Sequence, residues 1–174
     1  MRSLRIHFLL LAATLTGCAG TPATTPVPAR SDVLDPSEPV PLVRLKVHVH
    51  GVVDPDGTMN VGLYGDKDSW LTEEGVMFGK VEPVGAKGEV VTVIIEDVPA
   101  GQYAVSLYQD EDESKSLKRS SLGIPEEPWG MSNDATGLLG PPSFESAAIT
   151  VAPPETEVDI NLRTGLGARM TTDS

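Results

Sequence analysis

The sequence predicts an all-β domain, an antiparallel β-sandwich of about seven short strands with one long ordered loop. Apolar and polar residues alternate along several short segments, which is the period of a strand with one buried face. The 174 residues include 17 Gly and 15 Pro, which favour turns between strands over long helices. No long helical pattern is present, and the segments are spaced as in a sandwich. We expect this domain to span residues 42–163.

The clearest strand is Leu42–His50, in which every second residue from Val43 to Val49 is apolar and the residues between are basic. Residues 54–57 (DPDG) form a typical turn, since Pro presets φ and Gly permits a positive φ. The segment Thr58–Tyr64 is expected to be the return strand of a hairpin.

The other strands are expected at residues 88–98, 102–109, 146–151 and 157–162. Residues 66–74 are ambiguous, because Asp68 or Ser69 could cap a short helix carrying Trp70 and Leu71. Residues 110–145 show no periodicity and form the predicted long loop. Residues 164–174 are predicted to be a disordered tail.

The first 17 residues predict a signal peptide. Arg2 and Arg5 precede a short apolar run that ends in Leu15-Thr16-Gly17-Cys18, which resembles a bacterial lipobox. The resemblance implies lipidation of Cys18 and cleavage before it. Several acyl chains together hold a protein on a membrane far longer than one chain does.

Residues 18–41 are expected to be the lipidated Cys and a Pro-rich tether, which cannot bury enough apolar surface to fold. Residue 19 is Ala, a pattern that suggests sorting to the outer membrane. We therefore expect a lipid-anchored protein of the cell envelope whose partner through Cys18 is the membrane.

The formal net charge of −12 makes a nucleic-acid partner unfavourable, because an acidic surface repels phosphates. A single Cys excludes an internal disulfide and a multi-thiolate metal site. The sequence has no nucleophile-elbow motif of a serine hydrolase. We expect no enzymatic activity and no required cofactor.

Three segments together resemble the DUF2141 family of small secreted bacterial domains of unknown function. They are residues 97–105 (DVPAGQYAV), 123–135 (GIPEEPWGMSNDA) and 140–147 (GPPSFESA). The resemblance extends over about residues 42–163 and implies an immunoglobulin-like or transthyretin-like sandwich. It implies no activity.

Within this resemblance, residues 109–120 occupy the place of a family segment that looks like a calcium loop. Asp110 and Asp112 keep carboxylates and Ser114 offers a hydroxyl, but Lys115 replaces a Gly and Lys118 an Asp. Calcium takes six to eight oxygen ligands. The alternatives are a calcium site at Asp110, Asp112 and Ser114, or a solvated acidic loop tip.

The loop around Trp129, Asn133 and Asp134 is a candidate interaction surface, because loops on rigid sandwiches often carry function. The alternative is that Trp129 folds back over the sandwich with Leu138, Leu139 and Phe144. In that case the polar side chains of residues 132–134 would satisfy backbone groups.

His48 and His50 project from one face of a strand and could start a metal site, or could simply be solvated.

The leading functional interpretation is a membrane-anchored lipoprotein that carries a non-catalytic binding or envelope-associated module, with a protein or glycan partner. One alternative is a calcium-stabilised adhesion-type module. A second is an enzyme with an unrecognised carboxylate site.

Overall fold

The computed structural model describes residues 39–170 except 53, 56 and 139. The described residues belong to one compact unit, Ser37–Ser174. The predicted signal peptide, Cys18 and nearly all of the predicted tether lie outside the described residues. No helix in the described part of the chain is long and apolar enough to cross a membrane.

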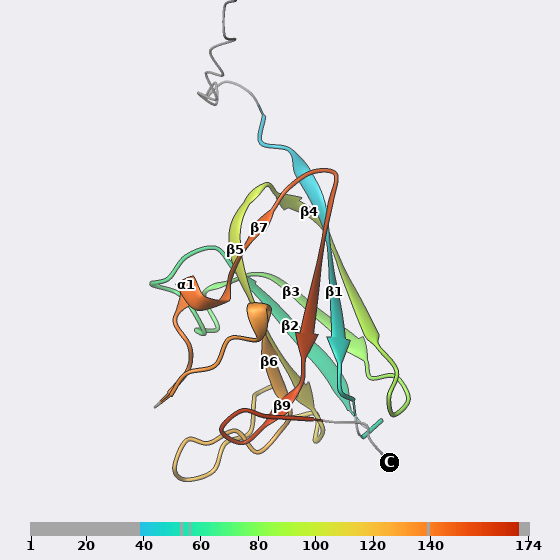
Figure 1. Cartoon of the computed structure of the whole chain (residues 1–174), viewed down its shortest axis with the longest axis vertical. Helices are drawn as coiled ribbons and strands as arrows, with labels where there is room; N and C mark the ends of the chain where they lie inside the picture. The colour runs from blue at the N-terminus through green and yellow to red at the C-terminus, as the bar shows by residue number, and fades with distance from the viewer. Residues whose placement is uncertain (1–38, 53, 56, 139, 171–174) are drawn as a thin grey trace, which may run out of the picture. The chain divides into compact units, whose positions relative to one another are not determined.

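The smaller of two sheets, called here the small sheet, has the strand order β4-β1-β8. β1 (Leu42–His50) pairs with β4 (Val91–Pro99) in antiparallel and with β8 (Glu155–Asn161) in parallel. Within the predicted antiparallel sandwich, β8 is thus paired in parallel. The chain reaches β8 from a strand of the other sheet, over the end of the sandwich where β1 begins (Figure 1).

The larger sheet, called the large sheet, has the order β10-β9-β6-β5-β2-β3, and β7 pairs with β5 beside β6. Its central strand β5 pairs with β7 through its first half and with β6 through its second half. Its strands are β2 (Thr58–Tyr64), β3 (Val76–Pro83), β5 (Gly101–Asp110), β6 (Trp129–Met131), β7 (Ala148–Val151), β9 (Arg163–Thr164) and β10 (Ala168–Arg169).

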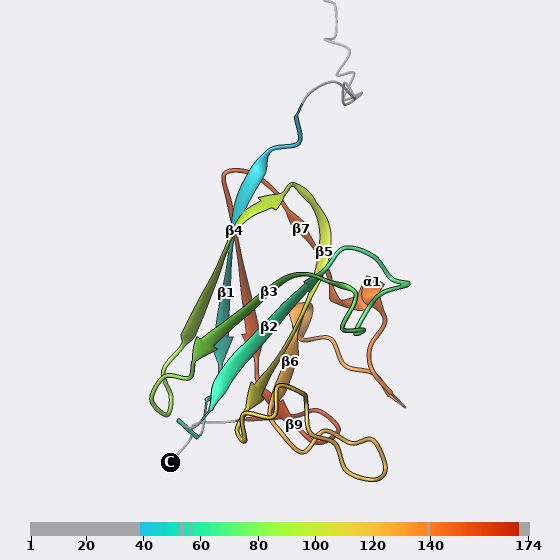
Figure 2. The same ribbon diagram turned by 180° about the vertical axis from the view of Figure 1, so that it is seen from behind.

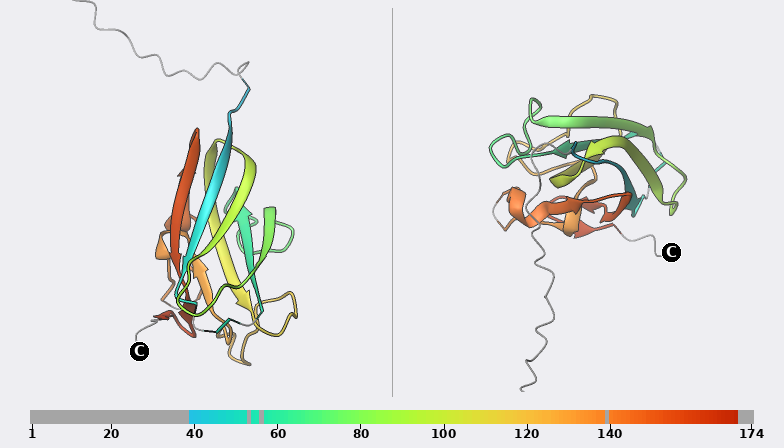
Figure 3. Two further views of the ribbon diagram at one scale, coloured as in Figure 1. Left: turned by 90° about the vertical axis from the view of Figure 1, so that its right-hand side faces the viewer. Right: turned by 90° about the horizontal axis from the view of Figure 1, so that it is seen from above.

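The two sheets face each other across one apolar core, which confirms the predicted β-sandwich. In the side view of Figure 3, red β8, cyan β1 and yellow-green β4 lie in front of the large sheet. The core takes alternate residues of β1, β2, β4, β5 and β8, as the period of two requires. Its fully buried members include Leu45, Leu63, Leu107 and Ile160.

The predicted hairpin of Leu42–His50 and Thr58–Tyr64 is wrong, although both strands have the predicted bounds. β1 and β2 lie in different sheets, so the intervening residues carry the chain across the core. Both strands bury one apolar face, and each does so against the other sheet. The crossing ends at Gly57 (φ 85°), where a Cβ would lie 2.0 Å from the carbonyl oxygen of Asp110.

The ambiguous residues 66–74 form turns rather than a short helix. Asp66 organises them by accepting hydrogen bonds from the Asp68 N–H and the Ser69 hydroxyl, both at 2.6 Å. The following strand β3 was not predicted. It is an edge strand with mostly exposed or half-buried residues, so it lacks an alternating pattern.

The predicted disordered tail is also corrected in part. β9 and β10 form a short hairpin that pairs through Arg163 with Trp129 of β6. Residues 171–174 lie outside the described residues.

The outer face of the large sheet carries a second apolar cluster. It is built on Ala104, Trp129 and Met131, and the loops on this face add Trp70 and Phe144. Phe144 begins the short helix α1 (Phe144–Ala147), which Ser143 caps by accepting a hydrogen bond from the Ser146 N–H. Through Trp70 and Phe144 the cluster packs the loops against the outer face of the large sheet. Figure 2 shows the path of these loops beside β2 and β5.

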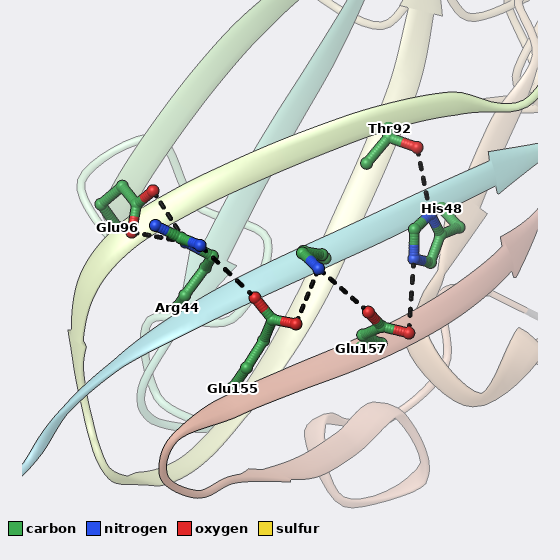
Figure 4. Close-up of polar contacts among 7 residues, drawn as sticks. Arg44, His48, Thr92, Glu96, Glu155 and Glu157 are labelled. Atoms are coloured by element: carbon green, nitrogen blue, oxygen red, sulfur yellow. Dashed lines mark hydrogen bonds and ion pairs between the residues drawn. The ribbon is translucent and has the colours of Figure 1, made fainter.

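The outer face of the small sheet is a ladder of opposite charges (Figure 4). Arg44 donates to Glu96 at 2.9 Å, and His48 lies 3.1 Å from the Thr92 hydroxyl. His50 lies 2.7 Å from Asp159. The two imidazoles thus have separate polar partners across the sheet.

Lys46 completes this ladder by donating to Glu155 at 2.7 Å and to Glu157 at 3.1 Å. The hydrogen bond from Lys46 lowers the pKa of the Glu155 carboxyl below its ordinary 4.5. The hydrogen bond from the Ser69 hydroxyl likewise lowers the pKa of Asp66.

We predict a loss of stability in acid. A carboxyl whose folded pKa is lowered contributes stability above its unfolded pKa, and that stability disappears as the pH falls through the folded pKa. Tm should therefore fall steadily as the pH drops below 4.5, and Glu155→Gln should make the fall shallower. Thermal melts from pH 7 to pH 2.5 measure this. The exposed Glu74, changed to Gln, is the control. Equal acid sensitivity of Glu155→Gln and the parent chain would contradict the prediction.

Candidate functional site

A groove of about 580 Å³ lies on the outer face of the large sheet. Its floor is a row of small residues across three strands. In this row Gly62 of β2 pairs with Gly79 of β3 on one side and with Ser106 of β5 on the other. The larger side chains of Tyr64 and Tyr108 flank this row. A Cβ on Gly79 would touch only a methyl group of Val76, at 3.6 Å, so the space above it is open. The Tyr64 ring covers Gly62, with its Cε2 3.2 Å from where a Cβ would stand, so the open part of the floor is at Gly79.

Tyr64 presents a hydroxyl to this groove. The residue is 8% exposed, and its ring packs edge-on against Trp70 at 5.0 Å between centroids. Its hydroxyl lies over Gly62, 3.5 Å from where a Cβ would stand. The hydroxyl makes no hydrogen bond to any residue that the structure describes, and burial raises its pKa. The hydroxyl can both donate and accept a hydrogen bond, so both capacities stay available to a ligand in the groove.

Two loops form the walls of the groove. One is residues 71–73, held on the sheet by the apolar cluster around Trp70. The other is residues 115–119, in which Leu117 packs on the same cluster. Lys115 and Arg119 are exposed on this second wall, and Glu73 stands on the first. The groove therefore combines an aromatic floor with one cationic wall.

Two buried carboxylates hold the second wall in place. Asp110, 1% exposed at the end of β5, accepts the N–H groups of Ser114 at 2.9 Å and Lys115 at 2.7 Å. Glu127, 2% exposed, accepts the N–H groups of Glu111 at 3.1 Å and Lys118 at 2.8 Å. Burial of these charges is offset by charge-assisted hydrogen bonds to the backbone.

The wall contains a residue in an unusual backbone conformation. Lys115, which stands where the family resemblance expects Gly, has φ 64°. This left-handed region favours Gly and costs other residues about 1 kcal/mol. The two N–H bonds to Asp110 offset that strain, so the turn keeps its shape without the Gly.

The predicted calcium ligands Asp110, Asp112 and Ser114 only partly come together. One carboxylate oxygen from each of Asp110, Asp112 and Glu127 lies within 4.8 Å of the other two. The Ser114 hydroxyl instead donates to the carbonyl of Ser116 at 3.0 Å. The Ser114 side chain and backbone lower the pKa of Asp112, and Lys118 Nζ lies 3.5 Å from the Asp112 carboxylate. Glu127 was not among the predicted ligands.

We predict that millimolar calcium leaves Tm unchanged relative to EDTA. The acidic cluster offers three carboxylates beside a lysine, against the six to eight oxygens that calcium takes. Thermal melts in both conditions measure this. A bound ion at a hundred times its Kd would add about 2.7 kcal/mol, a rise of roughly 8 °C. A rise of that size that Asp112→Asn abolishes would establish the calcium-stabilised alternative.

The predicted interaction residues make internal contacts. Trp129 is 8% exposed, and its indole N–H donates to the carbonyl of Gly165 at 3.0 Å. Asn133 donates to the carbonyl of Ala148 at 2.8 Å, and Asp134 accepts the N–H of Asn161 at 3.0 Å. The short 3₁₀ turn η1 (Ser132–Asp134) thereby joins β6 to β7 and β8.

A second, smaller pocket of about 100 Å³ lies beside Trp129 and is lined by the exposed Leu138 and Leu166. Leu138 therefore does not fold back with Trp129 and Phe144, as one expectation had it. Leu139 lies outside the described residues.

The sequence interpretation did not identify the groove residues. Tyr64 and Tyr108 lie near the ends of two predicted strands, on the face opposite the core. Two large aromatic residues on that face were the signal in the sequence that could have indicated the groove. Gly79 belongs to the strand that was missed. Glu127 lies in a segment that resembled the family, but only the fold brings it to Asp110.

Comparison with known protein families finds a match. A family model described as an uncharacterized protein conserved in bacteria (DUF2141) matches residues 47–159, well over half of the chain. No curated protein and no solved structure matches.

Proposed function

Because the chain belongs to the DUF2141 family, whose role is not described, we propose its function from the groove: a non-catalytic ligand-binding module of the bacterial cell envelope. The observation that carries the proposal is the hydroxyl of the largely buried Tyr64, which lines a groove of about 580 Å³ and has no partner among the described residues. Ligand sites combine apolar and aromatic surface with a few convergent polar groups. The groove has this composition.

The carboxylate geometry supports a binding role over a catalytic one. Asp110 and Glu127 each accept two backbone N–H bonds, so both act in holding the loop. A pair of carboxyl groups in a glycosidase stands at least about 5 Å apart across an open substrate site. Here Asp110 and Glu127 are 1% and 2% exposed, so neither carboxylate faces an open substrate site.

The calcium-stabilised adhesion module is a second candidate, supported by the close approach of Asp110, Asp112 and Glu127. Thermal melts in EDTA and in millimolar calcium decide between this candidate and the leading proposal.

We also propose that the module is anchored to the outer membrane through lipid on Cys18. The support is the sequence pattern that ends at this residue. Metabolic labelling of the full chain with radioactive palmitate should give a labelled band in the membrane fraction. Cys18→Ser should lose both the label and the membrane association. An unlabelled parent chain would contradict the lipid anchor, and the proposal that the groove binds a ligand would be unaffected.

An array of peptidoglycan fragments and of oligosaccharides from lipopolysaccharide and capsule tests the groove itself. The chain from residue 37 onward can be used, since it is a compact unit with its own core. We expect binding that Gly79→Leu abolishes, because the new side chain fills the open space above the floor. Gln102→Leu, on an exposed site of the same sheet face, is the control. Binding that Gly79→Leu leaves intact would contradict the proposal.

A further inference from the structure

We propose that the ligand of the groove is an acidic saccharide, a short chain of sugars bearing carboxylates. This inference rests on the proposed binding function and specifies its ligand. It is carried by three features of the groove: the tyrosine floor, the unpaired hydroxyls and the cationic wall.

The floor suits a sugar ring. A pyranose has an apolar face of C–H groups and a rim of hydroxyls, and tyrosine offers a matching apolar ring with a polar tip. Tyr64 and Tyr108 flank the row of Gly79, Gly62 and Ser106, and the polar groups of the lining include the Tyr64 and Ser106 hydroxyls. Neither hydroxyl has a hydrogen-bond partner among the described residues. Both are free to pair with sugar hydroxyls.

The wall adds a preference for negative charge. Lys115 forms no ion pair within the described part of the chain, and Arg119 uses its guanidinium there in one hydrogen bond, to the carbonyl of Gly123 at 3.2 Å. Both are exposed and line the groove, on a chain whose net charge is −12. The opposite wall has the single carboxylate of Glu73. Two cations on one wall are complementary to the carboxylates of an acidic sugar chain.

The backbone that carries Lys115 and Arg119 is held in position before any ligand arrives. The Lys115 N–H donates to the buried Asp110, and the Lys118 N–H donates to the buried Glu127. The backbone of Arg119 also forms an isolated antiparallel β-bridge with that of Pro125 across the loop. Because the wall is fixed, binding has little loop-ordering entropy to overcome.

Isothermal titration with tetragalacturonate, an acidic tetrasaccharide, tests this inference, with maltotetraose as its neutral counterpart. The chain from residue 37 onward is used. We expect tetragalacturonate to bind at least about tenfold more tightly than maltotetraose, and added salt to reduce the difference. Equal affinity for the two sugars would overturn the inference, while the proposed binding function would stand.

Three variants test the assigned roles. Lys115→Gln combined with Arg119→Gln should raise the Kd for tetragalacturonate about tenfold or more, since two charge-assisted hydrogen bonds are lost. Tyr64→Phe should raise the Kd about fivefold by removing one hydrogen bond to the ligand. Lys87→Gln, an exposed lysine outside the groove, should leave the Kd unchanged.

Circular dichroism melts show whether each variant folds. Tyr64→Phe removes a single oxygen, so it keeps the test valid if the double variant is unstable. An affinity for tetragalacturonate that is unchanged in Tyr64→Phe and in the folded double variant would overturn the inference. Failure of tetragalacturonate to bind, with groove-dependent binding on the array intact, would overturn the inference alone. If no fragment on the array binds in a way that Gly79→Leu abolishes, both the inference and the proposed function are overturned.

Discussion

Leu45→Ala should lower the free energy of unfolding by about 3 kcal/mol, the middle of the range for a buried leucine. Leu45 is fully buried at the centre of β1, where the small sheet faces the large one. The cavity cannot be filled without moving both sheets. For a domain of this size we expect Tm to fall by roughly 10 °C, measured by circular dichroism.

Leu42→Ala is the matched control, because it makes the same change at an exposed site on the same strand. Its effect should stay within about 0.5 kcal/mol. Similar losses in the two variants would mean that the core does not lie between the sheets as described.

Glu127→Ala should cost about 2–4 kcal/mol and loosen the cationic wall of the groove. The variant removes the acceptor of the part-buried N–H groups of Glu111 and Lys118, at about 1–3 kcal/mol for each donor. Relief of repulsion from Asp110 and Asp112 offsets part of this cost. Urea unfolding gives the free energy, and amide hydrogen exchange of residues 115–119 reports the loosening.

Glu126→Ala is the control, since its side chain is exposed and only its backbone N–H bonds across the loop, to the carbonyl of Lys118. Slow exchange of residues 115–119 in Glu127→Ala would contradict the role assigned to the buried carboxylate.

Local pattern was enough to predict some elements and insufficient for others. β1 and β2 have the bounds that alternation predicts, because each buries one face and exposes the other. Their pairing was wrong because alternation shows which face is buried and not which sheet buries it. β3 was missed because an edge strand with little buried surface leaves no period in the sequence.

The candidate site was harder to predict for the same reason. Asp110 and Glu127 are 17 positions apart and meet only because Gln109 at the end of β5 donates its N–H to the carbonyl of Pro128 before β6. The groove depends on three strands aligning Gly79, Gly62 and Ser106 in one row. Such a row is a property of register, which the sequence does not show directly.

The most direct test of the binding groove is a two-dimensional amide NMR spectrum of the chain from residue 37 onward, titrated with tetragalacturonate. The groove predicts that the amide signals of Gly62, Gly79 and residues 115–119 shift progressively and saturate. Shifts that instead cluster at Leu138 and Leu166, beside the smaller pocket, would contradict the account.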